Sequence, residues 1–136
     1  MSDASPALRH ATTAVRLLMG LAFLVFGLNG FLHFIPEPAT AMPEGAAAFA
    51  GALMQSGYMF PLIFCTQALV GLLLVVNRFV PLALVLIAPF LVNALAFHVF
   101  LEPSGLPVVL VFAALEGFLA WRYRAAYRPL LTARAG

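Results

Sequence analysis

Four long apolar runs, separated by short polar segments, make up most of the 136 residues of this chain. They extend over about residues 14–34, 58–76, 79–100 and 106–121. Each run approaches the roughly 20 residues that an α-helix needs to cross a hydrocarbon core about 30 Å thick. The pattern therefore predicts an all-α protein in which four transmembrane helices form a bundle, with residues 1–136 as a single integral membrane domain.

A shorter helix is expected between the first and second runs, over about residues 43–56. Pro43 suits the start of such a helix, and Gly57 suits its end. At about 1.5 Å per residue this helix would cover only about 20 Å, which is less than the thickness of the hydrocarbon core. We therefore expect an interfacial helix on the outer membrane surface or a re-entrant helix in the mouth of the bundle.

The arginines predict how the chain is oriented in the membrane. They lie before or at the start of the first run, between the second and third runs, and after the fourth: Arg9, Arg16, Arg78, Arg122, Arg124, Arg128 and Arg134. Four antiparallel spans place all of these positions on one side, and basic residues concentrate on the cytoplasmic side of membrane proteins. Both termini are therefore predicted to be cytoplasmic, with the segment from Ile35 to Gly57 outside.

Composition excludes several classes of protein. Apolar residues make up 64% of the chain and charged residues 9%, whereas soluble domains carry roughly one quarter charged residues. The net positive charge comes from the arginines that set the orientation in the membrane, so no nucleic-acid partner is expected. The single cysteine, Cys65, excludes an intrachain disulfide. A cleavable signal peptide ending near Ala39–Ala41 is disfavoured, because the first run is longer than the roughly 7 to 15 residues of a usual signal core.

The ends of the first and third runs repeat one polar order. Each contains an asparagine, then a histidine, then a glutamate four residues after the histidine: Asn29, His33 and Glu37, and Asn93, His98 and Glu102. Two histidines and two glutamates could bind zinc, iron or manganese, which makes His33, Glu37, His98 and Glu102 a weak metal-site candidate. Histidines at span ends more often cap helices or meet head groups, so no bound metal is expected.

One polar side chain per run forms a second candidate group: Asn29, Gln67, Asn93 and Glu116. The amides are most simply hydrogen-bonding contacts between helices, each worth about 0.6 kcal/mol. An ionised carboxylate inside a membrane is costly, so Glu116 is expected to be protonated or paired with one of these amides. Glu116, together with His98 and His33, is a candidate for proton handling, and a purely structural role for Glu116 stays open.

Three glycines of the first run, Gly20, Gly27 and Gly30, predict close helix contacts. Their positions do not distinguish a contact within one chain from a contact between two copies. A homo-oligomer therefore remains an alternative to a monomer.

Four segments resemble the DoxX-like family of small bacterial four-helix membrane proteins. They are the sequences Gly-Leu-Asn-Gly-Phe at 27–31, Ala-Phe-Ala-Gly-Ala-Leu-Met-Gln-Ser-Gly-Tyr at 48–58, Asn-Arg-Phe-Val-Pro-Leu-Ala-Leu at 77–84, and Leu-Glu-Pro-Ser-Gly-Leu-Pro at 101–107. The resemblance covers roughly residues 14–131. It implies a four-helix bundle in the bacterial inner membrane and an association with redox systems, and it supplies no catalytic residues.

Two functions follow from these expectations. The first is a partner-dependent membrane subunit of a redox or quinone-linked system, and the alternative is a non-catalytic accessory subunit beside a larger respiratory or photosynthetic complex. Signatures of c-type haem, flavin, dinucleotide and iron–sulfur binding are absent from the sequence, so the chain is not expected to be an enzyme on its own. We expect no intrinsic cofactor, a quinone or lipid as the ligand, and the lipid bilayer and other membrane subunits as partners.

Overall fold

The protein is all-α, as the sequence predicts. The computed structural model describes residues 4–134 and 136, and within them every regular element is a helix. The elements are α1 (Pro6–Leu32), α2 (Glu44–Gln55), α3 (Met59–Val75), α4 (Val80–Phe100), the short 3-10 helix η1 (Pro103–Gly105), α5 (Leu106–Arg122) and the 3-10 helix η2 (Arg124–Leu131).

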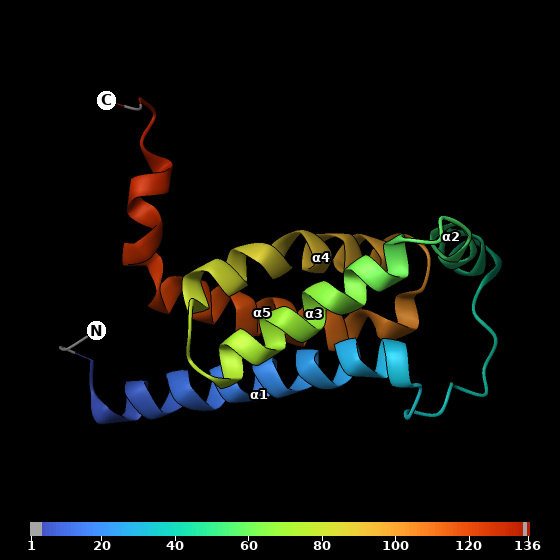
Figure 1. Ribbon diagram of the computed structural model, residues 1–136, viewed down its shortest axis with the longest axis horizontal. Helices are drawn as coiled ribbons and strands as arrows, with labels where there is room; N and C mark the ends of the chain where they lie inside the picture. Colours follow the sequence, from blue (N-terminus) through green and yellow to red (C-terminus); the bar gives the residue numbers. More distant parts are fainter. Residues whose placement is uncertain (1–3, 135) are drawn as a thin grey trace.

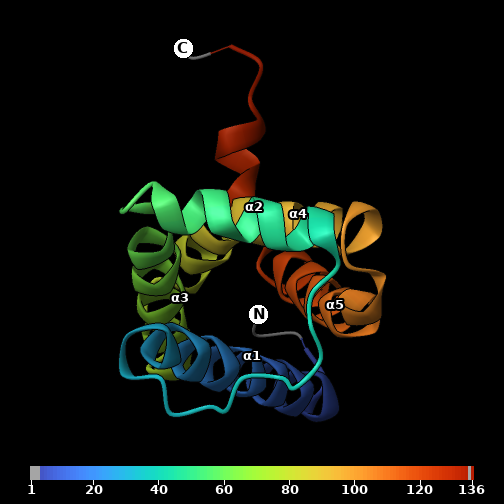
Figure 2. The same cartoon turned by 90° about the vertical axis from the view of Figure 1, so that its right-hand side faces the viewer.

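Four helices pack side by side with alternating directions, and each contacts the next in the order α1, α3, α4, α5 and back to α1 (Figures 1 and 2). The start of α1, the α3–α4 connection and the end of α5 lie together at the left of Figure 1. This end of the bundle carries the arginines, and we call it the basic end. The opposite end is covered by α2, which runs crosswise over it in Figure 2, and we call it the α2 end.

Three helical segments are long and apolar enough to cross a membrane: Pro6–Leu32, Val80–Phe100 and Pro103–Arg122. α2 and α3 meet the same criteria only as a pair, and the pair is bent by 90°. Large apolar side chains such as Leu18, Leu72 and Val92 are exposed on the outside of the bundle. Such a surface suits a lipid environment, because contiguous apolar patches are rare on soluble proteins.

The helix bounds lie close to the expected ones, with one difference. α1 begins at Pro6, eight residues before the expected position 14, because Ser5 and Pro6 form a helix start. The Ser5 hydroxyl accepts a hydrogen bond from the Leu8 amide at 3.2 Å, and proline at the first helical position has no amide hydrogen to leave unsatisfied. α2 begins after Pro43, as expected, and Gly57 follows it with φ of 76°.

The glycines of α1 make contacts within the chain, where α1 meets α3. A Cβ on Gly27 would lie 2.4 Å from the Ala68 amide nitrogen, and a Cβ on Gly71 would lie 2.3 Å from the Leu24 nitrogen. Backbones can approach this closely because glycine places no side chain at the contact. Gly20 and Gly30 likewise face Leu74 and Phe64 of α3.

The apolar core lies toward the basic end. Its members come from the middle of α1, the second half of α3, the first half of α4 and the second half of α5: Met19, Phe23, Val70, Leu74, Val80, Ala83, Leu84, Ile87, Leu91 and Leu119. The remaining half of the bundle, beneath α2, is less tightly filled. The candidate site lies in this second half.

Candidate functional site

Two neighbouring hollows, which we call lobes, share part of their lining in the half of the bundle nearer α2. The first lobe, of about 360 Å³, is formed by side chains of α1, α3, α4 and α5. The second lobe, of about 280 Å³, lies between α2, α3 and α4. Gln67, Phe90, Ala94 and His98 line both lobes. We call the two lobes together the aromatic cavity.

Aromatic rings form a large part of its walls. Seven phenylalanines besides the shared Phe90 line one lobe or the other: Phe23, Phe26, Phe49, Phe60, Phe64, Phe97 and Phe112. Phe23 packs against Phe90 with ring centroids 6.2 Å apart, and against Phe112 at 5.3 Å. In the other lobe Phe49 of α2 meets Phe97 of α4 at 5.7 Å, so α2 contributes to the wall. Such walls suit a flat, apolar ligand.

Three polar side chains interrupt the apolar walls: Gln67 of α3, and Asn93 and His98 of α4. Gln67 is only 7% exposed although it carries an amide. A few convergent polar groups in an apolar cavity are the usual arrangement by which a protein orients a small ligand. These three residues were all candidates from the sequence, and the structure brings them to one cavity.

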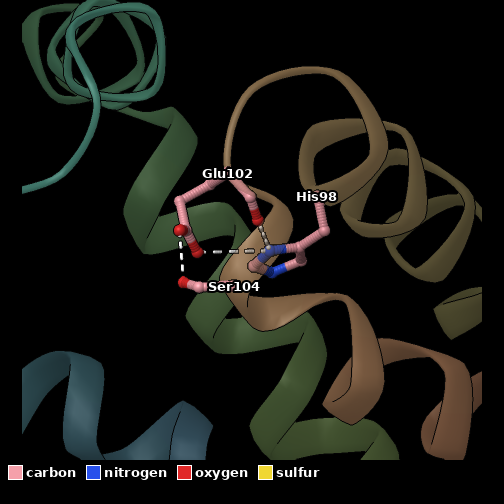
Figure 3. A network of polar contacts seen from close by, with 3 residues as sticks. All are labelled: His98, Glu102 and Ser104. Carbon is pink, nitrogen blue, oxygen red and sulfur yellow. Dashed lines mark hydrogen bonds and ion pairs between the residues drawn. The ribbon is translucent and has the colours of Figure 1, made fainter.

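His98 is held by the connection that follows α4, as Figure 3 shows. Its Nδ1 atom lies 2.8 Å from the Glu102 backbone oxygen and 3.6 Å from the Glu102 carboxylate. The Ser104 hydroxyl donates a hydrogen bond to that carboxylate, and this bond lowers the pKa of Glu102 below its ordinary value. Gly105 lies against the ring, because a Cβ there would be 2.1 Å from His98 Cε1.

This geometry determines what His98 can do chemically. A backbone carbonyl only accepts hydrogen bonds, so Nδ1 must carry the proton that it shares with Glu102. Nε2 of the neutral ring is then the acceptor available to a ligand. His98 can therefore accept a hydrogen bond, or a proton, from a ligand hydroxyl.

The repeated Asn, His, Glu order does not produce one shared site. Asn29, His33 and Glu37 line a separate hollow of about 450 Å³. The Asn29 side chain accepts a hydrogen bond from the Ile35 amide at 2.7 Å, so it caps the end of its own helix. Among the described residues, no group of three or more histidine, cysteine or acidic side chains could hold a metal ion. Within the part of the chain that the structure describes, His33, Glu37, His98 and Glu102 are therefore not gathered into one metal-binding group.

Glu116 lies on α5 apart from the aromatic cavity. Its Oε2 atom is buried and has no hydrogen-bond partner within residues 4–134 and 136, so the expected pairing with an amide of another helix is not observed for this oxygen. Nearby, the Tyr127 hydroxyl donates a hydrogen bond to the Pro81 backbone oxygen at 2.9 Å. Burial, with a smaller contribution from Glu116, raises the pKa of Tyr127 to about 12. Tyr127 thereby attaches η2 to the start of α4.

The sequence did not predict that two arginines would be buried at the basic end. Arg16 is 8% exposed and donates hydrogen bonds to the backbone oxygens of Leu74 and Val75, where α3 ends without further helical partners. Arg122 is 9% exposed and donates from Nε to the Thr12 hydroxyl at 2.8 Å. In the sequence, the sign of this burial is that Arg16 and Thr12 lie within an otherwise apolar helix.

Together these features define a helical protein whose helices are apolar enough for a membrane and which contains an aromatic cavity near one end. Comparison with known proteins adds no identity, since no family model, no curated protein and no solved structure matches this chain.

Proposed function

We propose that the chain is a four-pass protein of the bacterial inner membrane, with the basic end in the cytoplasm. α1, α4 and the segment Pro103–Arg122 have the length and composition of spans. α3 would be the fourth, because its 17 residues cover about 26 Å, close to the thickness of the hydrocarbon core. α2 would then lie in the outer interface. Arginines at a single end of the bundle support this orientation.

We further propose that the aromatic cavity binds a quinone. The observation that carries this proposal is an aromatic cavity whose lining includes Gln67 and His98 in both lobes and Asn93 in the second. A quinone head group is flat and apolar and has oxygens on opposite edges. Amide groups can donate to a quinone oxygen, and His98 can accept from the hydroxyl of the reduced quinol. The side of the cavity nearest α2 would face the outer leaflet.

In this proposal His98 handles protons and a partner handles electrons. The quinol hydroxyl gives its proton to Nε2, and Glu102 stabilises the resulting imidazolium through Nδ1. The two electrons of the quinol pass one at a time to a one-electron carrier in a partner subunit, because the sequence has no signature of a redox cofactor. The second quinol hydroxyl releases its proton to water at the outer interface. This assignment agrees with the resemblance to DoxX-like proteins, which we propose as the family. Glu116 is not part of this pathway.

Direct titration tests the proposal. A short-chain ubiquinone analogue should bind the detergent-purified protein saturably, measured by calorimetry, and an alkylbenzene of equal chain length should bind more weakly. His98→Leu should lower the affinity for the reduced quinol form of the analogue about tenfold, because the hydrogen bond from the quinol hydroxyl to Nε2 is lost. Thr66→Val is the matched control, since Thr66 neighbours Gln67 but lies outside the lining of both lobes and bonds to its own helix.

Two results would count against a quinone site. If the quinone analogue shows no saturable binding, the aromatic cavity is not a quinone site. Equal affinities for the quinone and the alkylbenzene, unchanged by His98→Leu, would mean that the cavity accepts any apolar chain. The second result would favour the alternative of a non-catalytic accessory subunit.

A further inference from the structure

A second hollow, of about 380 Å³, lies at the basic end, away from the aromatic cavity. It is formed by the beginning of α1, the end of α5 and η2, and its lining includes Leu8, Trp121, Arg122, Arg124 and Arg128. Three of these side chains are guanidinium groups. Among the described residues that line the hollow, none is acidic.

Arg122 supplies the strongest sign that the hollow receives an anion. The side chain is 9% exposed, and its Nε is already used by Thr12. Its Nη2 atom is buried without a hydrogen-bond partner in the part of the chain that the structure describes. A buried guanidinium with an unused donor is costly unless an acceptor completes its hydrogen bonds.

The other two arginines are arranged around the same space. Arg124 lies over the Trp121 ring at 5.0 Å and donates a hydrogen bond to the Trp121 backbone oxygen at 2.8 Å. Arg122 lies at 5.7 Å from the same ring, which therefore holds two guanidinium groups close together. The free carbonyl groups at the end of α5 carry roughly half a negative charge, which repels anions. The three full positive charges of the arginines outweigh this repulsion.

We propose that this hollow binds a phosphate group. Guanidinium groups pair with phosphate oxygens through two parallel hydrogen bonds, a geometry that favours arginine over lysine. The phosphate could belong to an anionic phospholipid of the inner leaflet or to a free phosphate ion. The partly buried Leu8 and the half-exposed Trp121 give the hollow an apolar side, as a lipid requires. The site is independent of any ligand in the aromatic cavity.

Fluorescence gives a specific readout, because Trp121 is the only tryptophan of the chain and lines the hollow. The purified protein in a neutral detergent is titrated with phosphatidylglycerol, with phosphatidylcholine and with inorganic phosphate. We expect a saturable change with phosphatidylglycerol at lower concentrations than with phosphatidylcholine. Saturation by inorganic phosphate alone, with no tighter binding of phosphatidylglycerol, would identify a free phosphate ion as the ligand.

Arg128→Gln is the main variant, because Arg128 is exposed and its loss should not disturb packing. It should weaken the binding of phosphatidylglycerol about tenfold, as expected for one charge-assisted hydrogen bond. Arg78→Gln, which removes an arginine of the same end outside the hollow, should leave binding unchanged. Arg122→Gln should weaken binding further, provided that its helical circular dichroism matches the wild type. Equal affinities for Arg128→Gln and Arg78→Gln, or no saturable change with any phosphate, would overturn the proposal.

Discussion

Replacing Gly71 with valine should separate α1 from α3 and lower the free energy of unfolding by about 3 kcal/mol or more. A Cβ at this position would lie 2.3 Å from the Leu24 nitrogen and 2.7 Å from the Gly20 oxygen. These are backbone atoms, so the overlap is relieved only if a whole helix moves. Thermal unfolding in detergent, followed by circular dichroism, should show a midpoint lower by roughly 10 °C.

Gly117→Val provides the matched control for this prediction. Gly117 also lies within a helix, α5, but a Cβ there would meet no atom within 4 Å. The same change in helix propensity is therefore introduced without a steric overlap. Equal unfolding midpoints for the two variants would show that α1 and α3 do not pack through Gly71.

Gly105→Ala should disable the aromatic cavity without changing any polar side chain. The backbone of Gly105 has φ of −86°, which alanine adopts without strain, so the effect must arise from the new methyl group. That methyl would lie 2.1 Å from His98 Cε1 and would displace the ring from the Glu102 backbone oxygen. Affinity for the reduced quinol form of the analogue should fall about tenfold, as it should for His98→Leu.

The position of the His98 proton provides a readout separate from ligand affinity. In the wild type, nitrogen NMR of labelled histidine should show the proton on Nδ1, and Gly105→Ala should change this signal. Gly51→Ala is the control, because Gly51 lies on α2 and a Cβ there would meet no atom within 4 Å. This variant should alter neither the affinity nor the NMR signal. An unchanged His98 signal in Gly105→Ala would contradict the placement of the ring.

The number and order of the helices could be predicted from the sequence, because each long apolar run became a helix within a few residues of its expected bounds, apart from the earlier start of α1. The pairing of His98 with Glu102 also follows from a spacing of four residues in the sequence. By contrast, α3 and α4 are apolar on nearly every side, so their sequences do not indicate which face points inward.

The direction in which each helix face points decides which of the candidate polar residues line the aromatic cavity. The Asn29 side chain accepts a hydrogen bond from the Ile35 amide at the end of its own helix, and Glu116 lies outside the aromatic cavity. The sequence had grouped both residues with Gln67. Only Gln67, Asn93 and His98 share the cavity. Contacts between distant segments, such as Arg122 with Thr12, depend on how the helices pack, so the sequence does not show which residues pair.

Orientation in the membrane is the claim on which both proposed sites depend, since it assigns the aromatic cavity to the outer half and the phosphate hollow to the inner leaflet. Single cysteines in a Cys65→Ser background test it in intact cells with a membrane-impermeant maleimide. Ala39 and Ala133 are both exposed, the first between α1 and α2 and the second beyond η2. The account predicts that the Ala39→Cys variant is labelled in intact cells and the Ala133→Cys variant only after permeabilisation. The reverse pattern, or labelling of both variants from outside, would contradict it.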